Sequence, residues 1–355
     1  MIKRRNARQI KVGGVKIGGN ALISIQSMTN TFTADVGATV SQIKRLEGAG
    51  CEIVRIAVKD AGDAAAVKEI KRKIKIPLAC DIHFNYKLAL MCIRSGADKI
   101  RLNPGNISKR DEVAAVVKAA KIARIPIRVG VNSGSVFTKD ERRKTKDGPL
   151  VKAALDYLKL LEAMDFRDII ISLKSSDVIS TIESYRKIAL LCDYPLHLGV
   201  TATGPYNRGI VKSSIGIGAL LADGIGDTVR VSLTADPVEE VHAAKKILGA
   251  VGARSFGPDI ISCPTCGRCK VDLIAMVNEL EEKLSAISFQ LSAKRPLKIA
   301  LMGCEVNGPG EAKDADIGIA FGRESGALFV KGKIIQKIKA KDFAREILKE
   351  IRNIR

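Results

Sequence analysis

The dominant pattern in the sequence is a short apolar, β-branched run followed by apolar positions at helical spacing, repeated eight times between about residues 22 and 250. Short apolar runs bounded by turn residues predict strands, and apolar residues recurring every three or four positions predict amphipathic helices. The predicted strands are 22–26, 53–58, 78–82, 99–103, 127–131, 169–174, 196–201 and 228–233. The predicted helices are 40–49, 63–74, 87–95, 111–123, 150–164, 177–191, 212–223 and 237–250.

Eight strand–helix units over roughly 230 residues predict an α/β fold of the (β/α)8 (TIM) barrel type. A doubly wound open sheet is the alternative, but it more often stops at five or six strands and carries a glycine-rich turn after the first. No G-x-G-x-x-G pattern follows the first predicted strand here. The two Gly-Gly pairs within residues 1–20 predict a short hairpin that precedes the barrel.

A break in the pattern at Gly252–Pro258 predicts a linker, because glycine, serine and proline interrupt regular structure. After it we expect a long helix over about 271–287, a hairpin over 327–335 and a final helix from residue 340. Further strands are expected near 259–262, 297–302 and 316–321. The predicted organisation is therefore a barrel over residues 1–253 and a smaller α+β domain over 254–355.

Polar residues alternate with apolar ones inside the predicted strands, as in the run Ile127–Asn132, where Arg128 and Gly130 separate apolar positions. The apolar face of a barrel strand packs on the helices, so the polar face points inward. The inward set comprises Gln26, Arg55, Asp81, His83, Arg101, Asn103, Arg128, Asn132, Ser172, Lys174, His197, Thr201 and Arg230. Arg230 lies in the middle of its predicted strand, so a structural role is an alternative for it. His197 is equally compatible with a buried core histidine whose hydrogen bonds are satisfied.

Such a concentration of cations inside a barrel is electrostatically untenable without an anionic partner. One internal ion pair, for instance between Asp81 and an arginine, does not neutralise four arginines and a lysine. We therefore expect a polyanionic ligand at the carboxyl ends of the strands, where barrel active sites form.

The whole chain is strongly basic, with 59 Lys+Arg against 38 Asp+Glu and a net charge of +21. This charge attracts anions of any kind, but nucleic-acid binding usually adds aromatic stacking residues. Tryptophan is absent and aromatic residues make up 4%, so a small anionic substrate is expected rather than nucleic acid. No apolar run approaches the length of a membrane span, and no apolar segment follows the basic Met1–Asn6. We expect a cytoplasmic protein that does not bind membranes.

Four of the eight cysteines form a pattern typical of metal sites. Cys263, Cys266 and Cys269 make a C-x2-C-x2-C run, and Cys304 follows at a distance. Structural zinc usually takes two separated pairs of ligands, whereas three clustered cysteines and a remote one match a [4Fe–4S] cluster better. Spacing alone favours iron–sulfur, leaves zinc open, and makes these four cysteines the ligand set.

The motifs Ser262–Arg268 and Met302–Ala312 resemble those of the 4-hydroxy-3-methylbut-2-en-1-yl diphosphate synthase family, which belongs to the methylerythritol phosphate route to isoprenoids. The resemblance continues along almost the whole chain. In the barrel it includes Gln26–Asn30, Asp81–Phe84, Arg101–Asn106, Arg128–Asn132, Ser172–Asp177, Leu196–Thr201 and Gly224–Leu233. Several independent motifs in the same order make coincidence an unsatisfactory explanation.

The resemblance implies an iron–sulfur oxidoreductase. Its reaction would be reductive ring opening and dehydroxylation of 2-C-methyl-D-erythritol 2,4-cyclodiphosphate to 4-hydroxy-3-methylbut-2-enyl diphosphate. Two electrons would arrive one at a time through a [4Fe–4S] cluster from a flavodoxin or ferredoxin, which the positive charge would steer. It further implies a homodimer in which the barrel of one subunit and the cluster of the other complete each site.

The resemblance also implies a ligand set that differs from the one spacing indicates. The cluster ligands would be Cys263, Cys266, Cys304 and Glu311, with Cys269 set aside. A carboxylate holds one iron less tenaciously than a thiolate, so substrate oxygen could displace Glu311 and reach the metal.

In the barrel, the resemblance implies that the diphosphate is held by Arg55, Arg101, Arg128, Asn132 and Lys174, with Thr201 in the same substrate site. Asp81 and His83 fall in the catalytic region, with their proton-transfer roles unassigned. The family's Val-Thr-Glu-Ala-Gly reads Val-Thr-Ala-Thr-Gly here, so Ala202 replaces a glutamate linked to protonation. Either another group, such as bound water, Asp81 or His83, would then supply the proton, or that role of the glutamate is dispensable.

Two other functions remain compatible with the residues themselves. One is a non-redox barrel enzyme that acts on a phosphorylated substrate and carries a structural zinc site. The other is a nucleic-acid-binding protein with a zinc ribbon, which would leave the polar strand positions of a barrel unexplained.

Overall fold

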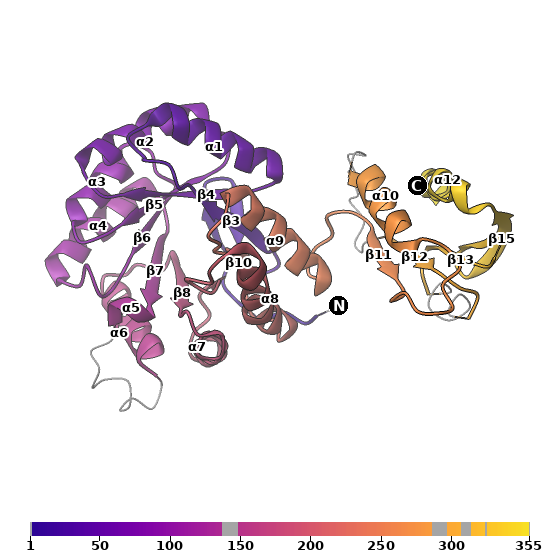
Figure 1. Cartoon of the computed structure of the whole chain (residues 1–355). Helices are drawn as coiled ribbons and strands as arrows, with labels where there is room; N and C mark the ends of the chain where they lie inside the picture. The colour runs from indigo at the N-terminus through magenta and orange to yellow at the C-terminus, as the bar shows by residue number, and fades with distance from the viewer. Residues whose placement is uncertain (1, 137–147, 286–296, 307–313, 324, 355) are drawn as a thin grey trace. The chain divides into compact units, whose positions relative to one another are not determined.

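The computed structural model describes residues 2–136, 148–285, 297–306, 314–323 and 325–354. The chain divides into two compact units, Met1–Ala253 and Arg254–Arg355, which are described separately below. In Figure 1 the first unit runs from indigo through magenta, and the second runs through orange to yellow.

The first unit is a barrel of eight parallel strands (Figure 1). The strands are β3 (Ser24–Met28), β4 (Ile53–Val58), β5 (Leu78–Ile82), β6 (Lys99–Leu102), β7 (Ile127–Asn132), β8 (Ile169–Lys174), β9 (His197–Leu198) and β10 (Thr228–Val229). They are hydrogen-bonded in the order β8-β7-β6-β5-β4-β3-β10-β9. The barrel closes between β8 and β9, where Ile171 forms a parallel bridge with Leu196. The predicted (β/α)8 fold is confirmed.

Helices surround the barrel and follow its strands. They are α1 (Val36–Ala49), α2 (Ala61–Lys73), α3 (Tyr86–Arg94), α4 (Arg110–Ala123), α6 (Pro149–Ala163), α7 (Val178–Leu191), α8 (Tyr206–Ala222) and α9 (Pro237–Ala250), with a short, unpredicted α5 (Ser133–Val136). Aspartates cap several of them: Asp35, Asp60 and Asp177 each accept a hydrogen bond from a backbone N–H of the first turn. Among the described residues, no helix is long and apolar enough to cross a membrane.

The last two barrel strands are shorter than the alternation predicts. Strand pairing stops at Leu198 and Val229, although the apolar pattern runs on to residues 201 and 233. The carbonyl oxygen of Arg230 packs so closely on Gly199 that an added Cβ there would lie 2.5 Å from it. The two segments therefore come together as irregular backbone, and Arg230 N still donates to Leu198 O at 3.0 Å.

A hairpin made of β1 (Ile10–Val12) and β2 (Val15–Ile17) precedes the barrel, as predicted. Its apolar side chains pack against inward-facing residues at the beginnings of barrel strands. The cluster comprises Ile10, Val12, Ile17, Ile53, Ala79 and Ile170. This apolar layer fills the amino end of the barrel. The polar interior therefore lies toward the carboxyl ends of the strands.

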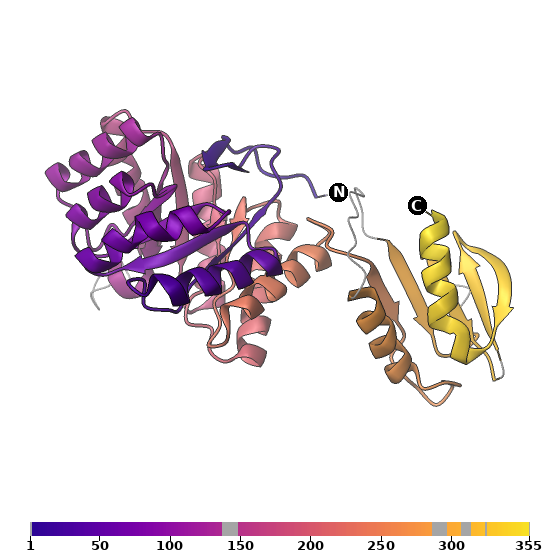
Figure 2. The ribbon, with the colours of Figure 1, turned by 90° about the horizontal axis from the view of Figure 1, so that it is seen from above.

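The second unit is an α+β sheet with the order β11-β12-β13-β14-β15. Its strands are β11 (Asp259–Ser262), β12 (Lys298–Met302), β13 (Ile317–Phe321), β14 (Gly326–Val330) and β15 (Lys333–Ile338). The first three are parallel and the last three antiparallel. Helices α10 (Leu273–Ser285) and α12 (Phe343–Ile354), the latter after a 3-10 turn at Ala340–Asp342, share one apolar cluster with the sheet. Figure 2 shows both helices in front of the strands.

Candidate active site

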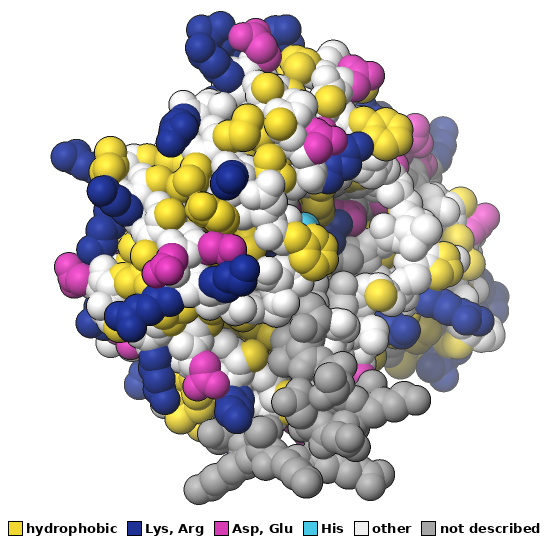
Figure 3. Space-filling view, turned by 90° about the vertical axis from the view of Figure 1, so that its left-hand side faces the viewer, with side chains coloured by type: hydrophobic (Ala, Val, Ile, Leu, Met, Phe, Trp, Pro, Cys, Tyr) yellow, Lys and Arg dark blue, Asp and Glu magenta, His cyan; other side chains and the backbone are white. Residues whose placement is uncertain are grey.

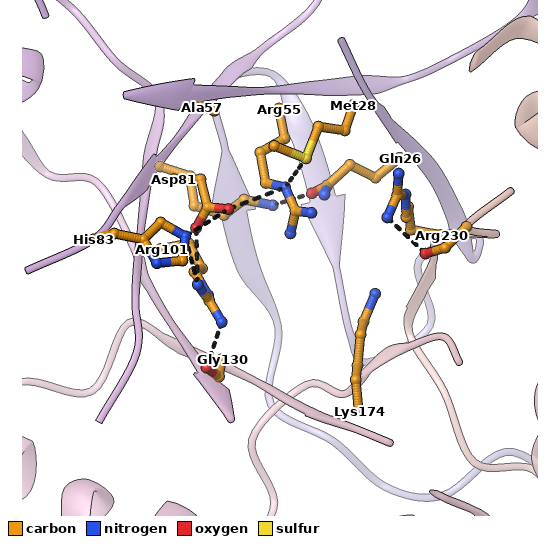
Figure 4. A network of polar contacts seen from close by, with 12 residues as sticks. Gln26, Met28, Arg55, Ala57, Asp81, His83, Arg101, Gly130, Lys174 and Arg230 are labelled. Atoms are coloured by element: carbon orange, nitrogen blue, oxygen red, sulfur yellow. Dashed lines mark hydrogen bonds and ion pairs between the residues drawn. The ribbon is translucent and has the colours of Figure 1, made fainter. Parts of the chain in front are cut away.

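The carboxyl ends of the barrel strands surround a hollow lined by charged side chains. Figure 3 shows this hollow with basic and acidic side chains and a histidine in its wall. Along β7, Ile127, Val129 and Val131 pack toward the helices, so Arg128 and Gly130 face the interior. The cationic side chains of this inner layer are Arg55, Lys99, Arg101, Arg128, Lys174 and Arg230, seen in part in Figure 4.

Asp81, on β5, is the acidic centre of the layer. Its Oδ1 accepts a hydrogen bond from Arg101 Nη1 at 3.1 Å, and its Oδ2 lies 3.8 Å from Arg55 Nε. Burial alone would raise the pKa of Asp81, but the charges of Arg55 and Arg101 outweigh burial and hold this pKa far below its usual range. Asp81 is therefore a fixed anion at neutral pH.

Arg101 is held by its two neighbouring strands. In the strand register Arg101 lies opposite Asp81 on β5 and opposite Arg128 on β7. Its Nη2 donates to Gly130 O at 2.7 Å. The absence of a side chain at Gly130 makes this position possible, because a Cβ there would lie 2.4 Å from Arg101 Nε.

His83 stands at the end of β5 and is the accessible member of the group, with its side chain 41% exposed. Asn106 Nδ2 lies 3.0 Å from His83 Nδ1. Arg101 Nη1 lies 3.3 Å from His83 Nε2, so a side-chain donor faces each of the two ring nitrogens. His83 Nε2 lies 3.5 Å from Asp81 Oδ2. Sequence reasoning did not single out Asn106, although it lies within the quoted motif Arg101–Asn106.

Arg128 carries the least satisfied charge of the layer. It is 1% exposed, and its Nε and Nη1 find no hydrogen-bond partner among the described residues. Burial, and then the charges of Arg55 and Arg101, lower its pKa. An arginine does not give up its proton in a protein, so the energetic cost remains as an uncompensated charge. An anion bound beside Arg128 would relieve that cost.

Lys174, at the end of β8, lies beside His197 in the interior. Lys174 Nζ is 3.4 Å from His197 Nε2, and burial lowers the pKa of both groups. Asn132 pairs with Lys174 in the strand register. Thr201 lies half-buried just after β9, and its backbone N–H donates to Ser175 O at 3.0 Å. The structure therefore places Asn132 beside Lys174 and Thr201 in the loop that follows β9.

Arg230 is neutralised, unlike Arg128. Its Nε and Nη2 donate to the two carboxylate oxygens of Glu240, on α9, at 3.1 and 2.9 Å. This bidentate pair fixes the guanidinium in place. Ser27 Oγ also donates to Glu240, at 2.9 Å. Glu240 was missed in the sequence because it belongs to a helix, and no strand alternation points to it.

The cysteine loops lie at one edge of the second unit's sheet. Cys263 follows β11 and Cys304 follows β12, and these neighbouring strands run parallel with Ser262 opposite Leu301. The backbone N–H of Gly303 donates to Cys263 Sγ at 3.3 Å. Cys304 is buried and Cys266 is exposed. Glu311 lies outside the described residues.

Cys269 lies at the same loops and makes a hydrogen bond of its own. Its Sγ donates to Val271 O at 3.2 Å, and an added Cβ at Gly303 would lie 2.4 Å from that sulfur. All four thiols are free of disulfides, so the loops offer soft thiol donors, which suit an iron–sulfur cluster. Within the described ranges, however, no three Cys, His, Asp or Glu side chains are gathered as metal ligands.

A family model described as the GcpE TIM-barrel domain matches residues 7–245, and the GcpE protein C-terminal domain matches residues 259–353. The chain belongs to the GcpE family. Relatives in Clostridium perfringens (54% identity, covering 99% of this chain and 100% of that protein) and Bacillus subtilis (53%, 98% and 91%) are named 4-hydroxy-3-methylbut-2-en-1-yl diphosphate synthase (flavodoxin). A relative in Thermodesulfovibrio yellowstonii with the same name is 53% identical over 99% of this chain and 100% of that protein. The predicted family is confirmed.

Solved structures of other barrel enzymes share the fold of the first unit. Dihydropteroate synthase from Stenotrophomonas maltophilia superposes with a TM-score of 0.53 at 15% identity, covering 70% of this chain and 100% of that chain. The Plasmodium falciparum HPPK-DHPS structure gives a TM-score of 0.51 at 14% identity, covering 69% and 49%. At such low identities this likeness concerns the barrel fold alone.

Proposed function

We propose that this protein is an iron–sulfur oxidoreductase of isoprenoid precursor biosynthesis. It would convert 2-C-methyl-D-erythritol 2,4-cyclodiphosphate to 4-hydroxy-3-methylbut-2-enyl diphosphate by reductive ring opening and loss of a hydroxyl group as water. Support comes from relatives of this name that match nearly the full chain. The structural observation that carries the proposal is the buried Arg128 guanidinium, whose Nε and Nη1 have no partner among the described residues.

The cyclic diphosphate would bind among Arg55, Arg101, Arg128 and Lys174, where its negative charge offsets theirs. Arg101 is already oriented by Asp81 and Gly130 O, so binding would cost little reorganisation of this side chain. A guanidinium can pair with a phosphate through two parallel hydrogen bonds, which fixes orientation as well as affinity. Asn132 and Thr201 would contact the polar groups of the same ligand.

We assign the proton delivery to His83 rather than to Asp81. Asp81 stays ionised beside two arginines, so it has no proton to give at neutral pH. Its role would be to hold Arg55 and Arg101 and to lie beside His83, whose Nε2 is 3.5 Å from Asp81 Oδ2. His83 is accessible, and in its imidazolium form it would donate one proton to the leaving hydroxyl group, which departs as water while His83 becomes neutral. This assignment supplies the acid that Ala202 cannot provide.

The cysteine loops would hold a [4Fe–4S] cluster through Cys263, Cys266, Cys304 and Glu311. Such a cluster, when bound, supplies the two electrons one at a time. The Gly303 N–H would stabilise the Cys263 thiolate, as backbone donors do in sulfur-ligated clusters. Cys269 would remain a thiol, because it donates to Val271 O. The electron donor would be a flavodoxin, as named for the relatives, or a ferredoxin, and the net charge of +21 would attract an acidic partner.

We further propose that the protein works as a homodimer whose sites combine the barrel of one subunit with the cysteine loops of the other. Mixing Arg128→Ala protein with inactive Cys304→Ser protein tests this after subunit exchange, at a substrate concentration too low for Arg128→Ala to turn over. Shared sites would restore part of the turnover, because a mixed dimer contains one intact site. No recovery in verified mixed dimers would contradict shared sites.

Anaerobic purification tests the cofactor against the zinc alternative. The proposal predicts a brown protein whose visible absorption bleaches with dithionite and whose iron and sulfide contents match one cluster per chain. A colourless protein with stoichiometric zinc would contradict it and favour a non-redox enzyme with a structural metal site.

A further inference from the structure

Lys99 is a buried cation to which the proposed reaction assigns no role. It is the first residue of β6 and is completely buried. Its Nζ donates to Gln26 Oε1 at 2.7 Å. Gln26 belongs to β3, and β4 and β5 lie between β3 and β6 in the sheet order, so this bond crosses the barrel interior. Lys99 precedes Arg101 by two residues and lies deeper on the same face of the strand.

The position of Lys99 is costly for the folded protein. No carboxylate lies within 4.0 Å of its Nζ among the described residues, and its partner is a neutral amide. Burial, and then the charges of Arg128 and Arg55, lower its pKa. An ammonium group that is removed from water without a counter-charge lowers the free energy of unfolding, and an apolar side chain of similar length would avoid this destabilisation. Lys99 thus has no evident stabilising function.

Lys99 also determines how the Gln26 amide is oriented. An ammonium group only donates, so the amide oxygen must face Lys99 and the NH2 group must face away. Gln26 is 1% exposed, and its Nε2 has no partner among the described residues. Figure 4 shows the Gln26 side chain reaching into the interior beside Arg55. The result is an oriented, unsatisfied donor next to the cationic layer.

We propose that Lys99 is a positioning residue for the anionic substrate, adding positive potential beneath the guanidinium groups and holding the Gln26 amide with its donor side toward them. The inference rests on the proposed function of this layer as a diphosphate site. In a low-dielectric interior a charge one layer below the ligand still contributes to binding, because little water screens it. Lys99 would therefore lower the stability of the free protein while raising its affinity for the ligand.

The test combines two measurements on Lys99→Met, with Lys68→Met as the matched control. Lys68 is exposed on α2, so both variants lose one positive charge through the same substitution. Calorimetric titration with inorganic diphosphate should give a Kd at least about tenfold weaker for Lys99→Met, the scale of one interaction with a charged group. The Tm of ligand-free Lys99→Met should equal or exceed that of the wild type. Lys68→Met should leave both values unchanged.

A merely structural role predicts the opposite result, namely a lower Tm with an unchanged Kd. Either an unchanged Kd or a lowered Tm of Lys99→Met, including its failure to fold, overturns the inference. Gln26→Met gives a second test, in which the same weakening of the Kd is expected and an unchanged Kd also overturns the inference. In the double variant the two losses of affinity should be less than additive, because Lys99 acts partly through Gln26. Failure of the wild-type protein to bind diphosphate would contradict the proposed function itself.

Discussion

Gly130 provides a precise structural test of the cationic layer. A methyl group added there, in Gly130→Ala, would lie 2.4 Å from Arg101 Nε and 3.2 Å from its Cζ, whereas ordinary contact begins near 3.4 Å. Arg101 must then retreat by about 1 Å, the difference between 3.4 and 2.4 Å. Arg101 is 3% exposed, so its guanidinium has little free space in which to move.

The retreat would weaken two charge-assisted hydrogen bonds, to Asp81 Oδ1 at 3.1 Å and to Gly130 O at 2.7 Å. A hydrogen bond to a charged group contributes about 1.5–3 kcal/mol, so a misplaced guanidinium that loses one such bond to the cyclodiphosphate should weaken its binding by roughly 10- to 100-fold. Crowding of the interior should also lower the free energy of unfolding by about 1–3 kcal/mol.

Titration calorimetry with the cyclodiphosphate, together with the Tm and the iron content, separates these effects. Gly249→Ala is the matched control, because a Cβ at Gly249 on α9 meets nothing within 4 Å. The control should bind as the wild type does and gain up to about 1 kcal/mol in stability. Wild-type affinity in Gly130→Ala would refute the placement of Arg101 in the binding layer. Equal losses in both alanine variants would refute a specific effect at Gly130.

Three further outcomes are expected. Arg128→Ala should raise KM for the cyclodiphosphate by about 100-fold while iron content stays unchanged, since a charged hydrogen-bonding group is lost. Unchanged kinetics would contradict binding of the substrate by the cationic side chains inside the barrel. Cys304→Ser should abolish iron binding and turnover, whereas Cys269→Ser should keep both, because that thiol bonds to a backbone carbonyl; loss of iron in the latter would restore Cys269 to the ligand set. The Kd for diphosphate should rise with pH. Burial lowers the pKa of Lys174 in the free protein, and a bound anion would raise that pKa. Between the two pKa values Lys174 takes up a proton when diphosphate binds, so binding weakens as the pH increases. A Kd that stays constant from pH 6 to pH 9 would contradict a titrating lysine in the site.

Much of the barrel was predictable because the same alternation of apolar and polar residues recurs along its strands. Alternation placed Arg55, Asp81, Arg101 and Arg128 on the inner face, and the structure brings Asp81 into contact with two of these arginines. The bounds of β4, β5 and β8 match the predicted ranges, since apolar runs with clear turns define them. Beyond the shortened β9 and β10, Arg230 O lies close to Gly199, a contact between distant segments that no local pattern reveals.

Partners from distant segments could not be read from the sequence. The Arg230–Glu240 pair joins a strand to a helix, and the Lys99–Gln26 bond crosses the barrel. Lys99 shares the inner face with Arg101, so the alternation that identified Arg101 contained the signal for it. The ligand role of Glu311 stays a prediction, because that residue lies outside the described ranges.

The reductive opening of the cyclodiphosphate by this protein can be tested directly. Iron-loaded protein is incubated anaerobically with 2-C-methyl-D-erythritol 2,4-cyclodiphosphate and reduced flavodoxin, and the products are separated by chromatography. The expected product is 4-hydroxy-3-methylbut-2-enyl diphosphate, formed with two electrons consumed per molecule. Unchanged cyclodiphosphate in the presence of folded, iron-loaded protein and reduced donor would contradict it.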